Sequence, residues 1–166
     1  NIETPKASLK SYWKEGPRNY LGLAIPGFPN LFTITGPGSP SVLSNMPVSI
    51  EQHVDWITEC IAHCIETGCT SIEAQEQSAE IWTDHVRETA DATLLPKVQH
   101  SWYLGANIPG KPRVFMPYAG GLNIYRKICD NVAEEGYKGF DLNSKKVRVT
   151  SKLLNFKSSE SFGLGV

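Results

Sequence analysis

The order of short apolar runs, glycine-rich turns and helical patterns constrains the fold of this chain most. A β-branched and aromatic run at 31–35 leads into a Gly-Pro-Gly turn at 36–38, and a helical pattern follows. A second run at 114–118 leads into a Gly-Gly pair at 120–121, and a helical pattern follows again. This repeated order predicts an α/β fold. Because two short strands make a poor sheet by themselves, we expect an incomplete domain whose other strands lie outside this sequence.

The first helical pattern has signals at both of its ends. Ser49 and Gln52 fit a capping box, and Gly68 fits the residue that stops a helix. Apolar residues recur between these signals at three- and four-residue steps, which is typical of an amphipathic helix. They are Ile50, Val54, Ile57, Ile61 and Ile65. With part of the sheet absent, we expect this apolar face to lack partners.

Two more amphipathic helices and a tail complete the predicted order. A second helix is expected over about 73–94, where a row of acidic residues fits a solvated face. A third is expected from Leu122 to a stop at Gly136. The segment 143–166 is rich in Ser and Lys and has few periodic signals, so we expect a weakly ordered tail. Residues 1–142 then make up the domain.

The charge balance argues against two classes of partner. The 16 Lys and Arg residues are matched by 17 Asp and Glu residues, for a net charge of −1. No excess of positive charge indicates a nucleic-acid or membrane surface, so neither partner is expected. No apolar run approaches the roughly 20 residues that span a bilayer. The start of the sequence has no secretory signal, and we expect a cytoplasmic protein.

The cysteines and histidines raise the question of a metal or a catalytic pair. Cys60, Cys64 and Cys69 are close in sequence, and His63 lies among them. Cys60 and Cys64 lie four residues apart in a helical pattern, whereas structural zinc sites usually place paired ligands in short knuckles. We therefore expect reduced thiols and no metal. No histidine has a partner in sequence that indicates a triad, so a structural or surface role is expected for each of His53, His63, His85 and His100.

Two turn-rich segments are candidates for ligand contact. At 36–38, the absent side chains would let the backbone approach a flat or phosphorylated ligand, or would simply allow a tight turn. The segment SWYLGANIPGKPRVF, 101–115, has too many glycines and prolines for a helix or a central strand. It nevertheless carries Trp102 and Tyr103 with the cations Lys111 and Arg113. On residue type alone, Trp102 is a half-buried core aromatic.

Two long strings connect these segments to a known family. They are YLGLAIPGFPNLFTITGPGSPSVLSNMPVSIEQHVDWI and SWYLGANIPGKPRVFMPYAGGLNIYRKICD. Both resemble the C-terminal part of type I Baeyer–Villiger monooxygenases of the phenylacetone and cyclohexanone monooxygenase type, over about 13–142. The resemblance implies the C-terminal portion of a Rossmann-like FAD-binding domain. It also implies bound FAD, NADPH as electron donor, and insertion of one oxygen atom of O2 beside a ketone carbonyl to give an ester or lactone.

The resemblance also assigns roles to the segment 36–46. In such enzymes the matching segment runs beside the flavin ring, which implies cofactor contacts for Gly36, Pro37 and Met46. Met46 is the best flavin contact, because it matches a position whose backbone lies against the flavin. The loop matching 42–44 borders the substrate pocket, and its residues here are Val42, Leu43 and Ser44.

The segment 101–112 resembles the part that folds toward the bound nicotinamide nucleotide. Trp102 matches a tryptophan that contacts NADP, and its aromatic ring would help to exclude water. Lys111 is assigned either a charge contact to the nucleotide or a solvated position. The implied partners are a ketone, O2 and the remainder of the flavoprotein chain.

No catalytic residue is assigned in this sequence. Two Gly-x-Gly-x-x-Gly fingerprints, a Phe-x-Gly-x-x-x-His signature and an active-site arginine are typical of the family, and none has a match here. The isolated chain is therefore expected to be inactive. Two other interpretations stay open. One is a non-catalytic α/β binding or assembly remnant of such an enzyme, and the other is a flavin monooxygenase that oxygenates nitrogen or sulfur.

Overall fold

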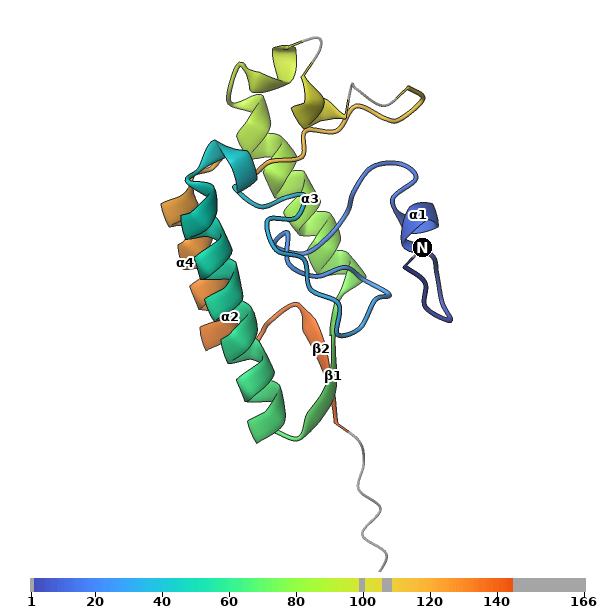
Figure 1. Ribbon diagram of the computed structural model, residues 1–166, viewed down its shortest axis with the longest axis vertical. Helices are drawn as coiled ribbons and strands as arrows, with labels where there is room; N and C mark the ends of the chain where they lie inside the picture. Colours follow the sequence, from blue (N-terminus) through green and yellow to red (C-terminus); the bar gives the residue numbers. More distant parts are fainter. Residues whose placement is uncertain (1, 99–100, 106–108, 145–166) are drawn as a thin grey trace, which may run out of the picture.

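The computed structural model describes residues 2–98, 101–105 and 109–144. Four helices and two strands follow one another along this part of the chain, in the order α1, α2, β1, α3, α4 and β2 (Figure 1). Their bounds are Leu9–Tyr12 for α1, Met46–Glu66 for α2, Cys69–Ala74 for β1, Glu76–Asp91 for α3, Leu122–Glu134 for α4 and Phe140–Ser144 for β2. The predicted α/β class is confirmed, because the described residues form a small unit of helices and a two-stranded sheet.

Helix α2 begins earlier than the capping box predicts. Asn45 is its N-cap and accepts a hydrogen bond from the backbone N–H of Val48, and a proline lies in the first turn. The capping role predicted for Ser49 is wrong, because this earlier cap places Ser49 inside the helix, where it is buried. At the other end Gly68 adopts a φ of 68°, as a glycine that follows a helix commonly does.

The buried and exposed sides of α2 have an unusual composition. The residues turned into the protein are Ser49, Gln52, His53, Trp56 and Cys60, of which the first three are polar. The apolar row from which the helix is predicted lies on the other side, where Ile50, Val54, Ile61 and Ile65 are exposed. Ile57, in the middle of the row, packs against the core, and the other four have exposed side chains among the residues that the structure describes.

The predicted strands at 31–35 and 114–118 are wrong for the part of the chain that the structure describes. Phe32 makes a single isolated bridge with Ala24, and the second segment has no strand. Both segments bond to loops instead. Thr33 donates its N–H to the carbonyl of Leu23, and Met116 donates to the carbonyl of Tyr103. Short apolar runs predict burial better than they predict a pairing partner.

The sheet consists of β1 and β2, which pair antiparallel and are not among the predicted strands. Ile72 lies opposite Leu142 and Ala74 opposite Phe140, so that apolar residues share one face. Because β1 continues to Ala74, α3 begins at Glu76, three residues later than predicted. The predicted tail begins within β2, and 145–166 lie outside the described residues.

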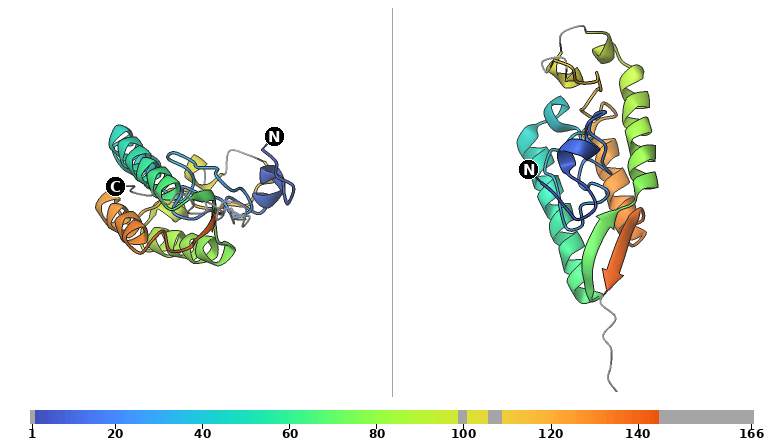
Figure 2. Two further views of the ribbon diagram at one scale, coloured as in Figure 1. Left: turned by 90° about the horizontal axis from the view of Figure 1, so that it is seen from below. Right: turned by 90° about the vertical axis from the view of Figure 1, so that its right-hand side faces the viewer.

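Aromatic side chains fill the core between the helices. Trp56 of α2 donates its indole N–H to the carbonyl of Cys129 in α4 at 2.9 Å. Trp82 of α3 stacks on Tyr118, with ring centroids 5.3 Å apart. Figure 2 shows the N-terminal loops packed along one side of α2, α3 and α4. Within the described residues, no helix combines the length and the apolar character needed to cross a bilayer.

A buried hydrogen bond from Tyr125 joins the N-terminal loops to α4. Its ring is fully buried, and its hydroxyl donates a 2.6 Å hydrogen bond to the backbone carbonyl of Leu21. Leu21 has a left-handed φ of 59°, which a leucine adopts only when its surroundings enforce it. Burial raises the pKa of the Tyr125 hydroxyl well above its usual range, so that it stays a donor.

Removal of the Tyr125 hydroxyl is expected to destabilise the fold. Tyr125→Phe leaves the Leu21 carbonyl buried without its partner, which costs about 1–3 kcal/mol. Tyr20→Phe is the matched control, because the Tyr20 hydroxyl donates to the Lys138 carbonyl at an exposed site. The control is expected to change the free energy of unfolding by about 0.5 kcal/mol or less. Urea denaturation of both variants measures the difference, and equal losses would contradict this role for Tyr125.

Candidate functional site

The two motif segments, far apart in sequence, are bonded to each other. The N–H of Gly38 donates to the carbonyl of Met116 at 2.6 Å, and the N–H of Tyr118 donates to the carbonyl of Ser39 at 2.7 Å. The segment that follows the Trp102 loop therefore runs beside the turn at 36–39. The two segments for which flavin and nucleotide contacts are predicted thus belong to one assembly of loops.

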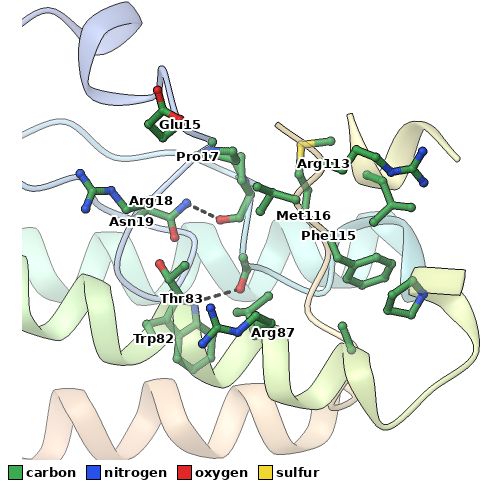
Figure 3. A pocket seen from close by; sticks show the side chains of 18 of the residues that line it. Glu15, Pro17, Arg18, Asn19, Trp82, Thr83, Arg87, Arg113, Phe115 and Met116 are labelled. Carbon is green, nitrogen blue, oxygen red and sulfur yellow. Dashed lines mark hydrogen bonds between the residues drawn. The ribbon is translucent and has the colours of Figure 1, made fainter. Parts of the chain in front are cut away.

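The turn at 36–39 is also held by side chains. The side-chain amide of Asn19 donates to the carbonyl of Pro37, and the indole N–H of Trp82 donates to the carbonyl of Gly38 (Figure 3). The hydroxyl of Ser39 donates to the carbonyl of Gly36 at 2.7 Å and closes the turn from within. Such a turn keeps its shape because each displaced bond would leave a buried polar group unpaired.

Close packing explains why positions 36 and 38 of this turn are glycines. A Cβ at Gly36 would lie 2.6 Å from the carbonyl oxygen of Gly22 and from the hydroxyl of Thr33. A Cβ at Gly38 would lie 3.0 Å from the amide oxygen of Asn19, at a φ of +82°. Both glycines thus admit close contacts within the protein. The cofactor contacts assigned to Gly36 and Pro37 stay predictions.

His53 supports the entry into this turn, which is a structural role as expected, although the sequence did not identify its partner. Thr35 has a left-handed φ of 51°, and its backbone N–H donates to Nδ1 of His53 at 2.9 Å. His53 is fully buried, and burial lowers its pKa to about 4. At neutral pH the ring is therefore uncharged, with its proton on Nε2. Among the described residues, Nε2 has no hydrogen-bond partner, and the ring packs edge-on against Tyr125.

The predicted substrate-pocket residues lie together just before α2. Val42 and Leu43 form part of a 3-10 turn, and Leu43 is 37% exposed. The hydroxyl of Ser44 shares a hydrogen bond with the hydroxyl of Ser49, which ties this loop to the buried side of α2. Met46 is the first residue of α2 and is half-buried. The four residues thus lie at the start of α2 or in the turn before it, and their cofactor and substrate contacts stay predictions.

Trp102 lies at the surface. It is 54% exposed, at the start of the 3-10 turn Trp102–Leu104, and its ring packs against that of Tyr103 at 4.4 Å between centroids. This exposure excludes a core role for Trp102 within the described structure. Lys111 is also exposed. Residues 106–108 of this loop, including Asn107, lie outside the described residues, as does His100.

A cavity of about 520 Å³ opens beside the turn, between the N-terminal loop, α3 and the segment 113–116 (Figure 3). Arg18, Arg87 and Arg113 line it together with the indole of Trp82. Of the eight predicted site residues, all of which are described, Pro37 is the one that contributes to its wall. Sequence reasoning missed this cavity because its walls come from segments that are distant in sequence, chiefly 15–19, 37–38, 82–91 and 113–116.

All four cysteines are free thiols, of which Cys60 and Cys129 are buried and Cys64 and Cys69 are partly buried. Burial raises the pKa of Cys60 to about 12 and that of Cys129 to about 12, and it raises the pKa of Cys64 to about 11. At neutral pH these thiols are protonated and weakly nucleophilic. Within the ranges that the structure describes, no group of three or more His, Cys, Asp or Glu side chains could hold a metal ion.

Comparison with known proteins identifies relatives of this chain. It is 42% identical to the cyclohexanone 1,2-monooxygenase of an Acinetobacter species, over 84% of this chain and 25% of that protein. It is also 42% identical to the phenazine N-monooxygenase of Lysobacter antibioticus, over 82% of this chain and 25% of that protein. A solved structure of an oxidized steroid monooxygenase bound to NADP is 48% identical, with a TM-score of 0.78, over 85% of this chain and 26% of that one.

The chain is therefore homologous to a segment of the Baeyer–Villiger monooxygenases, and the resemblance of its two long strings is confirmed. It spans about a quarter of the length of the relatives it matches. No family model matches the sequence.

The burial of His53 is expected to make stability depend on pH. Between its usual pKa of 6.5 and the folded value of about 4, the unfolded chain binds a proton that the folded chain does not. Stability is therefore complete above pH 6.5 and falls as the pH is lowered toward 4. At about 1.4 kcal/mol per pKa unit, the loss is on the order of 3 kcal/mol.

The His53→Asn variant isolates this contribution, because a side-chain oxygen can still accept from Thr35 while nothing titrates at position 53. Urea denaturation from pH 7.5 to 4 measures both proteins, and carboxylates elsewhere affect both alike. The free energy of unfolding of the wild type is expected to fall more steeply. Parallel profiles would show that His53 does not titrate as its burial requires.

Proposed function

We propose that this chain is the C-terminal portion of a flavin-dependent Baeyer–Villiger monooxygenase, which uses NADPH and O2 to convert ketones to esters or lactones. The identity of 42% to cyclohexanone 1,2-monooxygenase over 84% of this chain carries the proposal. The bonded arrangement of the two motif segments supports it, since both assigned cofactor regions then border one site. The steroid monooxygenase structure contains NADP, which supports a nucleotide site in this chain as well.

The residues present fit a supporting role toward these cofactors. FAD, when bound, supplies the oxygen chemistry, and the protein supplies position and environment. The half-buried Met46 and the exposed Leu43 offer apolar contact beside a loop that Ser49 holds in place. The exposed ring of Trp102 offers a flat surface for a nicotinamide nucleotide and a cover against water. The turn at 36–39 holds these two surfaces in a fixed relation through its backbone bonds.

The test uses the complete polypeptide that contains this sequence together with the two dinucleotide fingerprints. We expect the purified protein to carry flavin, to oxidise NADPH in the presence of a cyclic ketone, and to release the lactone. The 166-residue chain is the control and is expected to form no product. A complete polypeptide that carries no flavin and oxygenates no ketone would refute the proposal and favour a non-catalytic remnant.

Oxygenation of nitrogen is the second candidate. Phenazine N-monooxygenase matches this chain at the same 42% identity as cyclohexanone 1,2-monooxygenase, over nearly the same share of it. The sequence identity of this segment is therefore the same for a relative of each type and does not distinguish the two reactions. Assays of the complete polypeptide with cyclohexanone and with a phenazine decide the matter, since one product is a lactone and the other an N-oxide.

Trp102→Ala in the complete enzyme is expected to weaken the use of NADPH and to leave FAD bound. An aromatic contact contributes about 0.5–1.5 kcal/mol, which corresponds to a rise of roughly twofold to tenfold in KM for NADPH. More hydrogen peroxide should also form without product, because water reaches the site. Steady-state kinetics and peroxide assays measure both effects.

Two further variants control for a general loss of structure. Leu94→Ala removes another exposed apolar side chain and should leave KM unchanged. Trp102→Phe keeps an aromatic ring and should restore part of the affinity. If Trp102→Ala leaves both KM and coupling at wild-type values, the assigned nucleotide contact is wrong.

A further inference from the structure

The end of α2 brings two cysteines together. Thr67 is the C-cap of the helix, and Gly68 follows it with a left-handed φ of 68°. The N–H of Gly68 donates to the carbonyl of Ile65 at 3.2 Å, which is one of the two backbone bonds of a Schellman motif. In that motif the second residue after the cap commonly contacts the third residue before it. Here those two residues are Cys69 and Cys64.

The thiols of Cys64 and Cys69 are neighbours and are both partly accessible. Burial, and then a hydrogen bond to Cys69, raises the pKa of the Cys64 thiol to about 11. That hydrogen bond requires the two sulfur atoms to lie side by side. Both side chains are partly buried and unoxidised, at the point where α2 turns directly into β1 (Figure 1). The Cys69 thiol also donates to the carbonyl of Ser71 at 3.1 Å, which restrains its sulfur.

Cys60, one turn earlier on α2, is placed differently. It is fully buried, and it lies four residues before Cys64 on the same helix. Residues four apart on a helix have Cβ atoms about 5–6 Å apart, whereas a disulfide holds its two Cβ atoms at about 3.5–4.5 Å. A bond between Cys60 and Cys64 would therefore distort the helix. Cys69 lies beyond the end of the helix, so a bond to Cys64 has no such restriction.

We propose that Cys64 and Cys69 form a site of reversible oxidation, at which hydrogen peroxide converts the two thiols to a disulfide. A neighbouring thiol captures a sulfenic acid before it is oxidised further to sulfinic or sulfonic acid, which thiol reductants do not restore. The pair thereby spares this part of the chain from irreversible damage. The proposed function would supply peroxide whenever NADPH is oxidised without product, but the site requires only peroxide, whatever its source.

The oxidation takes place in two displacements. The thiolate of Cys69 attacks one oxygen of hydrogen peroxide, the O–O bond breaks, and the departing hydroxide takes up a proton and leaves as water. The sulfur of Cys64 then attacks the sulfenic sulfur of Cys69, the S–O bond breaks, and a second water leaves with the proton of Cys64. The two thiols lose two electrons in total, and the peroxide is reduced to two waters. Cys69 is assigned the first attack because burial keeps Cys64 protonated.

Peptide mapping of the complete polypeptide that contains this sequence tests the proposal. Cleavage after glutamate separates residues 60–66 from residues 67–73, so that Cys64 and Cys69 fall in different peptides. After treatment with hydrogen peroxide and blocking of the remaining thiols, we expect the two peptides to be joined, and dithiothreitol to release them. The joined pair should exceed an internal loop within 60–66 by at least about tenfold, because the helix disfavours that loop.

Variants identify which cysteine of the first peptide is joined. Cys60→Ala is expected to form the joined pair as the wild type does, and Cys64→Ser is expected not to form it. In Cys64→Ser the sulfenic acid of Cys69 has no neighbouring thiol, so dimedone should capture it. The wild-type map requires no substitution, so it decides the matter even where a variant folds poorly.

The same reaction in urea shows whether the folded helix end directs the pairing. Without the helix, loops of similar length close with similar probability, so the joined pair should exceed the internal loop by no more than about threefold. An equal ratio in the folded protein and in urea would overturn the proposal. So would oxidation of Cys64 and Cys69 to sulfinic acids without joined peptides. These readouts involve neither flavin nor ketone, so their failure is distinct from failure of the proposed function.

Discussion

The backbone bonds at Gly38 and Ser39 hold together the parts of the chain that define the candidate site. Gly38 donates to Met116 and accepts from Trp82 of α3, and Ser39 accepts from Tyr118. Asn19 secures the preceding carbonyl from the N-terminal loop. These bonds are buried or partly buried, so the loss of one would leave an unpaired polar group at a cost of about 1–3 kcal/mol. The positions of the turn at 36–39 and of the segment 113–118 are therefore set together.

Helix α2 connects this site to the rest of the molecule through two unlike faces. Its inner face carries Ser49 and His53, which bond to the loop at Ser44 and to the backbone of Thr35. Polar side chains are needed there because loops present unpaired backbone groups that a purely apolar face could not satisfy. The opposite side of the helix carries isoleucine and valine, which are exposed among the described residues.

Local signals predicted the helices well and the strands badly. Gly68 and Gly136 both follow helices at a positive φ, and the third helix begins at Leu122 as predicted. The start of α2 was ambiguous because Asn45 and Ser49 are both good caps, and the structure uses Asn45. Glu73 fits a helical pattern, yet it belongs to β1 because that strand pairs with a segment near the end of the described chain. Such pairing depends on a partner that no local window contains.

The sequence by itself determined where α2 and the third helix end, that α2 has an apolar stripe, and which family its two long strings resemble. These properties depend on neighbours within a few turns or on continuous strings of residues. Only the tertiary structure decided that the stripe faces outward, that His53 supports Thr35, and that the turn at 36–39 bonds to the segment 113–118. Periodicity reveals that a helix has two faces, but which face lies inside depends on what the remaining chain brings against it.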